Sequence, residues 1–83
     1  MPNSNARPAI LQMNTAGGWR NVIKLDFGHE AKARRAMKAA ATLADIGGAT
    51  ARVVIDDGTQ TVICHYAQAD GWVSWPDRSP MEL

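Results

Sequence analysis

The sequence predicts an α+β fold in which a single helix packs on one face of a small, mainly antiparallel sheet. The predicted order is strand, strand, helix, strand, strand, strand. Apolar and polar residues alternate along 19–27, apolar residues recur every three or four positions along 29–46, and an Asp-Gly pair at 57–58 separates two further alternating runs. Strict alternation indicates strands, the longer period indicates a helix, and Asp-Gly between apolar runs is typical of a hairpin.

The first predicted hairpin consists of two strand-like runs on either side of Gly17-Gly18. The run PAILQMN begins at Pro8, and WRNVIKLDF begins at Trp19. Alternate residues of a strand share a face, so one set of the second run should point into the core. That set is Trp19, Asn21, Ile23, Leu25 and Phe27.

The predicted helix extends from about His29 to Ile46 and ends at Gly47-Gly48, because glycine after an amphipathic run is a typical helix C-terminal cap. Its apolar stripe consists mostly of alanine, which lets a helix lie close to a sheet. We expect Met37 and Leu43 to be the larger residues that this stripe contributes to the core.

The run ARVVIDDGTQTVICHYA predicts the second hairpin. With Asp57-Gly58 as the two loop residues, Val53 pairs with Val62 and Arg52 pairs with Ile63. Arg52, Val54, Ile63 and His65 then share one face of the sheet, and Val53 and Cys64 share the other.

The run WVSWP supplies a short last strand that ends at Pro76. Trp72 and Trp75 are an odd number of residues apart, so a regular strand sends them to opposite faces. One helix covers only one face of such a sheet. The other face is expected to expose apolar residues and one tryptophan among basic neighbours: Val22, Val54, Ile63, Trp72 or Trp75, Arg20, Lys24, Arg52 and His65.

Composition indicates a single domain over residues 1–83, with flexible ends at 1–7 and 77–83. Nine cations oppose eight anions, and this balance excludes both an acidic DNA mimic and a uniformly basic nucleic-acid coat. The chain has one cysteine, so no disulfide forms within it. The first ten residues lack the apolar stretch of a secretion signal, and no run is long enough to span a membrane. We therefore expect a cytoplasmic protein with no membrane partner.

The residue patterns predict neither catalytic chemistry nor a metal or cofactor site. Cys64 and His65 are neighbours on a strand, so their side chains diverge, and no Cys-x-x-Cys or His-x-x-x-His spacing exists. Asp57 belongs to a turn, Asp56 solvates the end of a strand, and neither glycine pair forms a phosphate-binding loop. We expect a protein that is not an enzyme, with Cys64 as a buried apolar residue.

Four cations lie in the first turns of the predicted helix: Lys32, Arg34, Arg35 and Lys38. The helix dipole disfavours cations there by about 0.3–1 kcal/mol each. Two interpretations remain open. The cations form a solvated face balanced by neighbouring acids, or they form a patch that binds an acidic protein surface or nucleic-acid phosphates.

The predicted partner-binding residues combine this patch with the basic and aromatic residues of the sheet: Lys32, Arg34, Arg35, Lys38, Arg52, Trp72 and Trp75. A protein partner is the first hypothesis, with the cations steering association and a tryptophan as the anchor. One alternative is a nucleic-acid-binding module that uses the same cations and a tryptophan. Another is a structural or accessory protein that forms a homodimer through the open sheet face.

Three stretches resemble the small anti-CRISPR proteins of phages and other mobile elements: AKARRAMKAAATLADIGG, VVIDDGTQTVICHYA and DGWVSWPD. The similarity covers roughly residues 19–77 and is one of architecture and composition. It implies a non-enzymatic inhibitor in the cytoplasm of a host bacterial cell, which binds an RNA-guided CRISPR complex and blocks its nucleic-acid or partner binding. The balanced charge of this chain sets it apart from the acidic, DNA-mimicking members.

Overall fold

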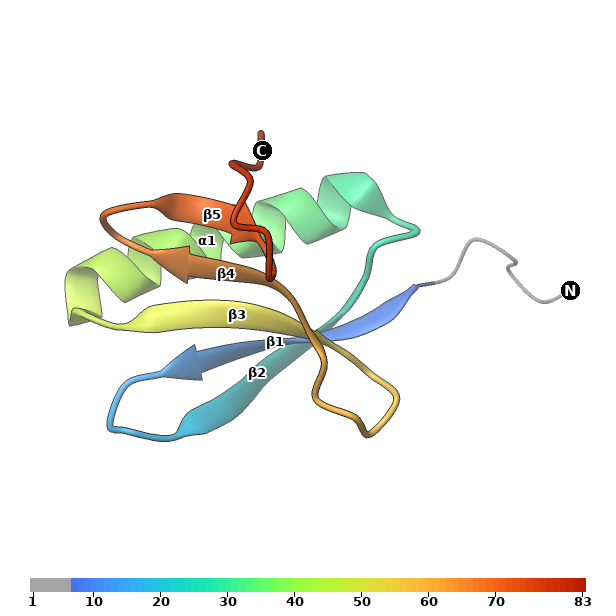
Figure 1. Cartoon of the computed structure of the whole chain (residues 1–83), viewed down its shortest axis with the longest axis horizontal. Coiled ribbons are helices and arrows are strands. Elements are labelled where there is room, and N and C mark those ends of the chain that lie inside the picture. The colour runs from blue at the N-terminus through green and yellow to red at the C-terminus, as the bar shows by residue number, and fades with distance from the viewer. Residues whose placement is uncertain (1–6) are drawn as a thin grey trace, which may run out of the picture.

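The computed structural model describes residues 7–83, in which five strands and one helix follow the predicted order (Figure 1). The elements are β1 (Pro8–Asn14), β2 (Trp19–Asp26), α1 (Glu30–Gly47), β3 (Thr50–Ile55), β4 (Val62–Ala67) and β5 (Gly71–Ser74). Each neighbouring pair of strands is antiparallel, and the order across the sheet is β2-β1-β3-β4-β5. The predicted α+β fold, with one helix and a small antiparallel sheet, is confirmed.

The core lies between α1 and one face of the sheet. The helix contributes Ala33, Met37, Ala40 and Ala44, and the strands contribute Ala9, Leu11, Ala51, Val53, Cys64, Tyr66 and Trp72. The burial of Met37 and Cys64 is as predicted. Leu43 is 57% exposed, which corrects the expectation that it fills the core. Ala40 and Ala44 face the sheet, and Leu43 is turned about 100° away from Ala44.

Two hydrogen bonds attach the helix to the last two strands. The indole Nε1 of Trp72 donates to the Met37 carbonyl at 3.0 Å, and the Tyr66 hydroxyl donates to Asp45 at 2.7 Å. A buried indole N–H needs an acceptor, and a backbone carbonyl of α1 satisfies it here. Trp72 is therefore the tryptophan of the core.

A β-bulge in β2 changes the face of its first residues. Leu11 pairs with Ile23, but Gln12 pairs with Asn21, so Val22 is the extra residue. An extra residue reverses the alternation on one side of the bulge. Leu25 stays against the core as predicted. Trp19 and Asn21 lie on the opposite face and Ile23 is 53% exposed, which corrects the predicted core position of these three side chains.

The pairing of β3 with β4 differs from the predicted register. Val53 pairs with Cys64 and Arg52 with His65, because the connection is longer than a two-residue turn and because β4 has an extra residue, Ile63, between the partners of Val54 and Val53. The Ile55 amide donates to the Thr61 carbonyl at 2.9 Å, and the Asp57 carboxylate accepts bonds from the backbone and hydroxyl of Thr59. These interactions stabilise the longer loop.

The face opposite α1 is less exposed than the alternation predicts. Val54 is completely buried, since it lies between Ile10 and Val62 on the neighbouring strands. Ile63 packs against the core cluster, because the register shift in β4 places it on the side of α1. Val22 is 51% exposed, as expected.

The segment after β5 runs along the outer edge of that strand. Val73 forms a β-bridge with Pro80, the Met81 amide donates to the Trp72 carbonyl at 3.0 Å, and Met81 and Leu83 pack against the core. These contacts cover an edge that would otherwise present unpaired backbone groups. They involve residues of the 77–83 segment for which the sequence predicts flexibility. The other predicted flexible end lies outside the described residues except for Arg7. Within residues 7–83, no helix has the length and apolar character needed to cross a membrane.

The left-handed cap at the end of α1 can be tested by substituting its two glycines. Gly48 has a φ of 65° and its amide donates to the Ala44 carbonyl, whereas Gly47 lacks a positive φ and ends the helix. A Cβ at either position meets no atom within 4 Å, so only the backbone conformation differs. We expect Gly48→Ala to lower the free energy of unfolding by about 1–2 kcal/mol, because the left-handed region disfavours L side chains.

The matched control is Gly47→Ala, which removes a flexible residue from the end of a helix. It should leave the free energy of unfolding unchanged or raise it by up to about 1 kcal/mol. Urea unfolding followed by tryptophan fluorescence measures both variants, and equal effects would contradict the left-handed cap.

Candidate binding site on the open sheet face

One row of cross-strand neighbours spans all five strands on the face opposite α1. Directly opposed residues of antiparallel strands point to the same side of a sheet. The pairings Asn21–Gln12, Gln12–Arg52, Arg52–His65 and His65–Val73 therefore form a continuous row from β2 to β5. This row is the floor of the candidate site.

Two tryptophans and Arg78 lie beside Arg52 and His65 of this row, and the five residues form a chain of contacts. The Arg52 guanidinium lies 4.2 Å from the centroid of the Trp19 ring, and the His65 ring stands edge-on to Trp19 at 6.0 Å. On its other side, His65 lies 5.3 Å from Trp75, and the Arg78 guanidinium lies 5.0 Å from the Trp75 centroid. We call these five residues the aromatic–arginine strip. Arg78 is exposed and the other four are partly exposed.

The buried side-chain amide of Gln12 fixes the position of Arg52 in the strip through a hydrogen bond. Its Oε1 accepts a hydrogen bond from Arg52 Nε at 2.7 Å, and its Nε2 donates to Asn21 at 2.8 Å and Gln60 at 3.2 Å. Gln12 is only 2% exposed, so these bonds replace the water that its amide loses on folding. The position of the Arg52 guanidinium over Trp19 is thus set by a bond within the sheet.

A hydrogen-bonded turn presents Arg78. The Arg78 amide donates to the Ser74 carbonyl at 2.8 Å, and the Asp77 carboxylate accepts bonds from the Ser74 and Ser79 hydroxyls, each at 2.7 Å. These bonds lower the pKa of Asp77. Arg78 has a φ of 61°, a conformation that costs a non-glycine residue about 1–2 kcal/mol. Gln60, which bonds to Gln12, shares this feature with a φ of 60°.

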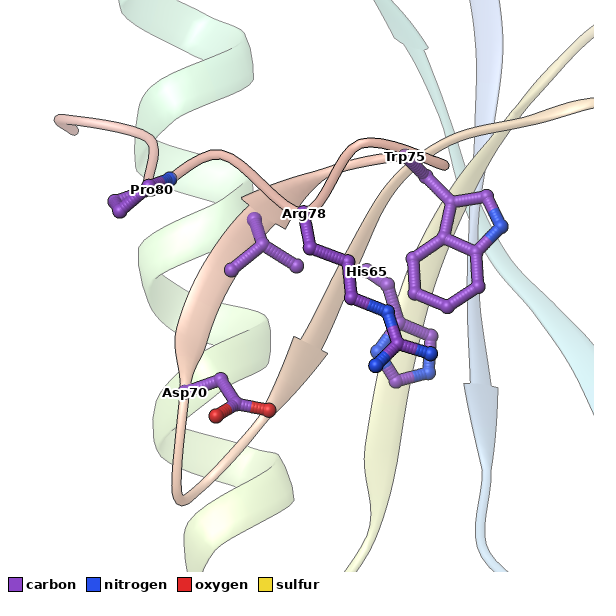
Figure 2. Close-up of a pocket in the computed structure, with 6 residues that line it drawn as sticks. His65, Asp70, Trp75, Arg78 and Pro80 are labelled. Carbon is purple, nitrogen blue, oxygen red and sulfur yellow. The ribbon is translucent and has the colours of Figure 1, made fainter.

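A hollow of about 380 Å³ adjoins one end of the strip. Its lining comes from β4, β5 and their following segments: His65, Asp70, Val73, Trp75, Arg78 and Pro80. Figure 2 shows Trp75 and Arg78 directed toward His65, whereas Asp70 stands apart at the β4–β5 turn. The hollow is therefore aromatic and cationic at one side and acidic at the other.

Neither arginine of the strip has a carboxylate of residues 7–83 within ion-pair distance. In residues 7–83 the ion pair within 4 Å is Lys24–Asp56, at 3.7 Å. Burial lowers the pKa of Arg52, but a guanidinium remains charged at any physiological pH. Burial also lowers the pKa of His65, with Arg52 and Arg78 adding to this effect and Asp70 opposing it. At neutral pH the strip thus combines three flat uncharged rings with two cations.

The structure divides the predicted site residues among three places. Arg52 and Trp75 belong to the strip, and Trp72 is 5% exposed beneath α1, so Trp72 is omitted from the candidate surface. The four basic helix residues are exposed on α1, across the sheet from the strip: Lys32, Arg34, Arg35 and Lys38.

Sequence reasoning missed the roles of four other residues: Trp19, Gln12, Gln60 and Arg78. It placed Arg52 and His65 on one face correctly. The direction of Trp19 was not predicted because an alternating run does not reveal the bulge at Val22. The position of Arg78 was not predicted because it follows the last strand, where alternation no longer indicates the direction of a side chain.

Cys64 lies outside the strip, and its thiol has low reactivity. It is 1% exposed, and burial raises the pKa of its thiol to about 12. The thiolate that acts as a nucleophile or metal ligand is therefore disfavoured. Residues 7–83 contain no group of three or more His, Cys, Asp or Glu side chains placed to hold a metal ion.

Comparisons with protein-family models, curated proteins and solved structures found no match to this chain.

The lowered pKa of His65 predicts that stability depends on pH. Below the ordinary His value of 6.5, the unfolded chain binds more protons at this position than the folded chain. The free energy of unfolding should therefore be lower at about pH 5.5 than at about pH 7.5, as measured by urea unfolding. His65→Gln should weaken this dependence. The control His29→Gln, at the exposed start of α1, should preserve it, and equal effects of the two variants would contradict the assignment to His65.

Burial of Cys64 predicts slow thiol labelling. A disulfide reagent at about pH 8 should modify the native protein at least ~100-fold more slowly than the urea-unfolded protein, because both exposure and the thiolate fraction rise on unfolding. Fast labelling of the native protein would show that β4 opens readily, in contradiction to the buried position of Cys64.

Proposed function

We propose that this chain is a non-enzymatic binding domain that contacts a macromolecular partner through its open sheet face. The aromatic–arginine strip carries this proposal. Tryptophan and arginine dominate the energetic centres of macromolecular interfaces, where flat side chains provide contact area at small entropic cost. Here two of each meet around His65 on a face that α1 leaves uncovered.

Preorganisation favours the strip over the helix as the contact surface. Gln12 orients Arg52, the Ser74–Ser79 turn presents Arg78, and each guanidinium already rests on an indole. Less side-chain entropy is lost when such groups bind a partner. The helix cations are long exposed side chains, and residues 7–83 provide no ion pair that orients them.

The resemblance to anti-CRISPR proteins suggests the partner. Two of the three stretches that carry it, VVIDDGTQTVICHYA and DGWVSWPD, contribute His65 and Trp75 to the strip. On this proposal the protein acts in the cytoplasm of a bacterial cell and occupies the surface of an RNA-guided CRISPR complex. Inhibition then follows from blocked access of the complex to its nucleic acid or to its effector subunit.

Affinity capture with matched variants tests the contact surface. The tagged protein is incubated with lysate of bacteria that express a CRISPR complex, and the complex is quantified after washing. Trp75→Leu keeps apolar volume but removes the indole, and Arg78→Gln removes one exposed cation. We expect both variants to reduce capture at least ~5-fold, because each removes a central contact.

The control is the double variant Arg34→Glu/Arg35→Glu on α1. Capture should persist with this variant if the open face is the contact surface. Loss of capture with the helix variant alone would transfer the contact surface to α1. Equal capture by all variants would contradict the proposed role of the strip. Plaque counts on cells with active CRISPR interference show whether capture also inhibits.

A further inference from the structure

The strip has the chemistry of a platform for unpaired bases. Its rings form an unbroken series from Trp19 through His65 to Trp75, with centroid separations of 6.0 and 5.3 Å. Every nucleobase offers a flat π face, and stacking on aromatic side chains is the principal sequence-tolerant contact of single-strand-binding proteins. Partly exposed rings on an open antiparallel sheet suit this contact, since no strand or helix of residues 7–83 covers them.

The charges of the strip complement a phosphate backbone. Arg52 lies over Trp19 and Arg78 over Trp75, at the two ends of the ring series, and no carboxylate of residues 7–83 lies within 4 Å of either guanidinium. Each guanidinium lies over an indole. A base that stacks on the same indole therefore brings its phosphate near a cation. Asp70 is the one acidic residue that lines the hollow, and it stands at the far turn, away from Trp75 and Arg78 (Figure 2).

The shape of the site favours a single strand over a duplex. In a duplex the base faces are stacked inside the helix, and sequence-tolerant duplex binding relies on a basic surface that follows two phosphate backbones. The two strip arginines lie on a half-buried aromatic surface of the sheet. An acidic protein surface would pair with the cations but would provide no flat group to stack on the rings.

We propose that the open sheet face binds a short segment of single-stranded nucleic acid. Two successive bases stack on Trp75 and Trp19, with His65 between them, and Arg78 and Arg52 bind the adjoining phosphates. One of these bases occupies the hollow between His65, Trp75 and Arg78. This inference rests on the proposed function of the open face and identifies its ligand class.

Fluorescence anisotropy with labelled ten-nucleotide oligonucleotides tests the proposal. The probes are oligo-dT, the corresponding oligo-U and a duplex of mixed sequence, each at 50 mM salt. We expect binding of at least one single-stranded probe and at least ~10-fold weaker binding of the duplex. The two single strands distinguish DNA from RNA as the source. Two phosphate contacts predict a log–log salt slope of about −1.4, which is about a sevenfold loss of affinity between 50 and 200 mM salt.

Variants assign the contacts. Trp75→Leu should weaken single-strand binding about 5- to 140-fold, because it removes one stacked base. Trp75→Phe should retain most of the affinity, which separates stacking from a general loss of fold. Arg78→Gln should reduce the magnitude of the salt slope by about 0.7. The matched control Arg34→Gln/Arg35→Gln removes two cations from α1 and should change neither the affinity nor the slope.

Three results would overturn the inference. One is equal or tighter binding of the duplex, and another is an equal loss of affinity in the α1 control. The third is no binding of oligo-dT or oligo-U at 50 mM salt. If this third result coincides with strip-dependent capture of a CRISPR complex, the ligand class is wrong and the proposed function stands. If capture also fails to depend on the strip, both proposals are wrong.

Discussion

The buried amide of Gln12 is the constraint on which the open face of this protein depends. A single helix covers one side of the sheet, so a polar residue at the centre of the other side must find its hydrogen-bond partners among neighbouring side chains. Gln12 does so by bonding to Arg52, Asn21 and Gln60, which come from β3, β2 and the β3–β4 loop. Stability and site geometry thus have a common origin, because the bonds that satisfy Gln12 also orient Arg52 over Trp19.

Two irregularities in the sheet convert a regular alternation into this arrangement. The bulge at Val22 moves Trp19 to the side of Arg52, and the irregular β3–β4 connection, a longer loop followed by an extra residue at Ile63, brings His65 opposite Arg52. Bulges re-aim side chains at a modest local cost in strand pairing. Without these two features Trp19 would face α1 and Arg52 would lie opposite Ile63, so the strip would not exist.

The two faces of the sheet divide stability from recognition. Against α1, whose buried residues are mostly alanine, the side chains are buried, and Trp72 and Tyr66 attach the helix by hydrogen bonds. On the open face the rings and Arg52 are partly exposed and Arg78 is exposed, and aromatic and cation–π contacts join them. This division explains why cations on α1 and aromatic residues of the strip do not combine into one site, although both are prominent in the sequence.

The sequence by itself determined the element order, the amphipathic alanine stripe of α1 with its glycine cap, and the shared face of Arg52 and His65. These features depend on local periodicity and backbone preference, which neighbouring residues decide. Tertiary structure alone decided the β3–β4 register, the direction of Trp19, the burial of Val54 and the placement of Arg78 beside Trp75. The direction of Trp19 and the burial of Val54 depend on partners on neighbouring strands, as does the position of Arg52, since Gln12 lies 40 residues from Arg52 and 48 from Gln60. Arg78 is placed by a local turn after β5, which an alternating pattern does not describe. An alternating pattern cannot show where a strand gains an extra residue, because a bulge is defined by how the strand pairs with its neighbour.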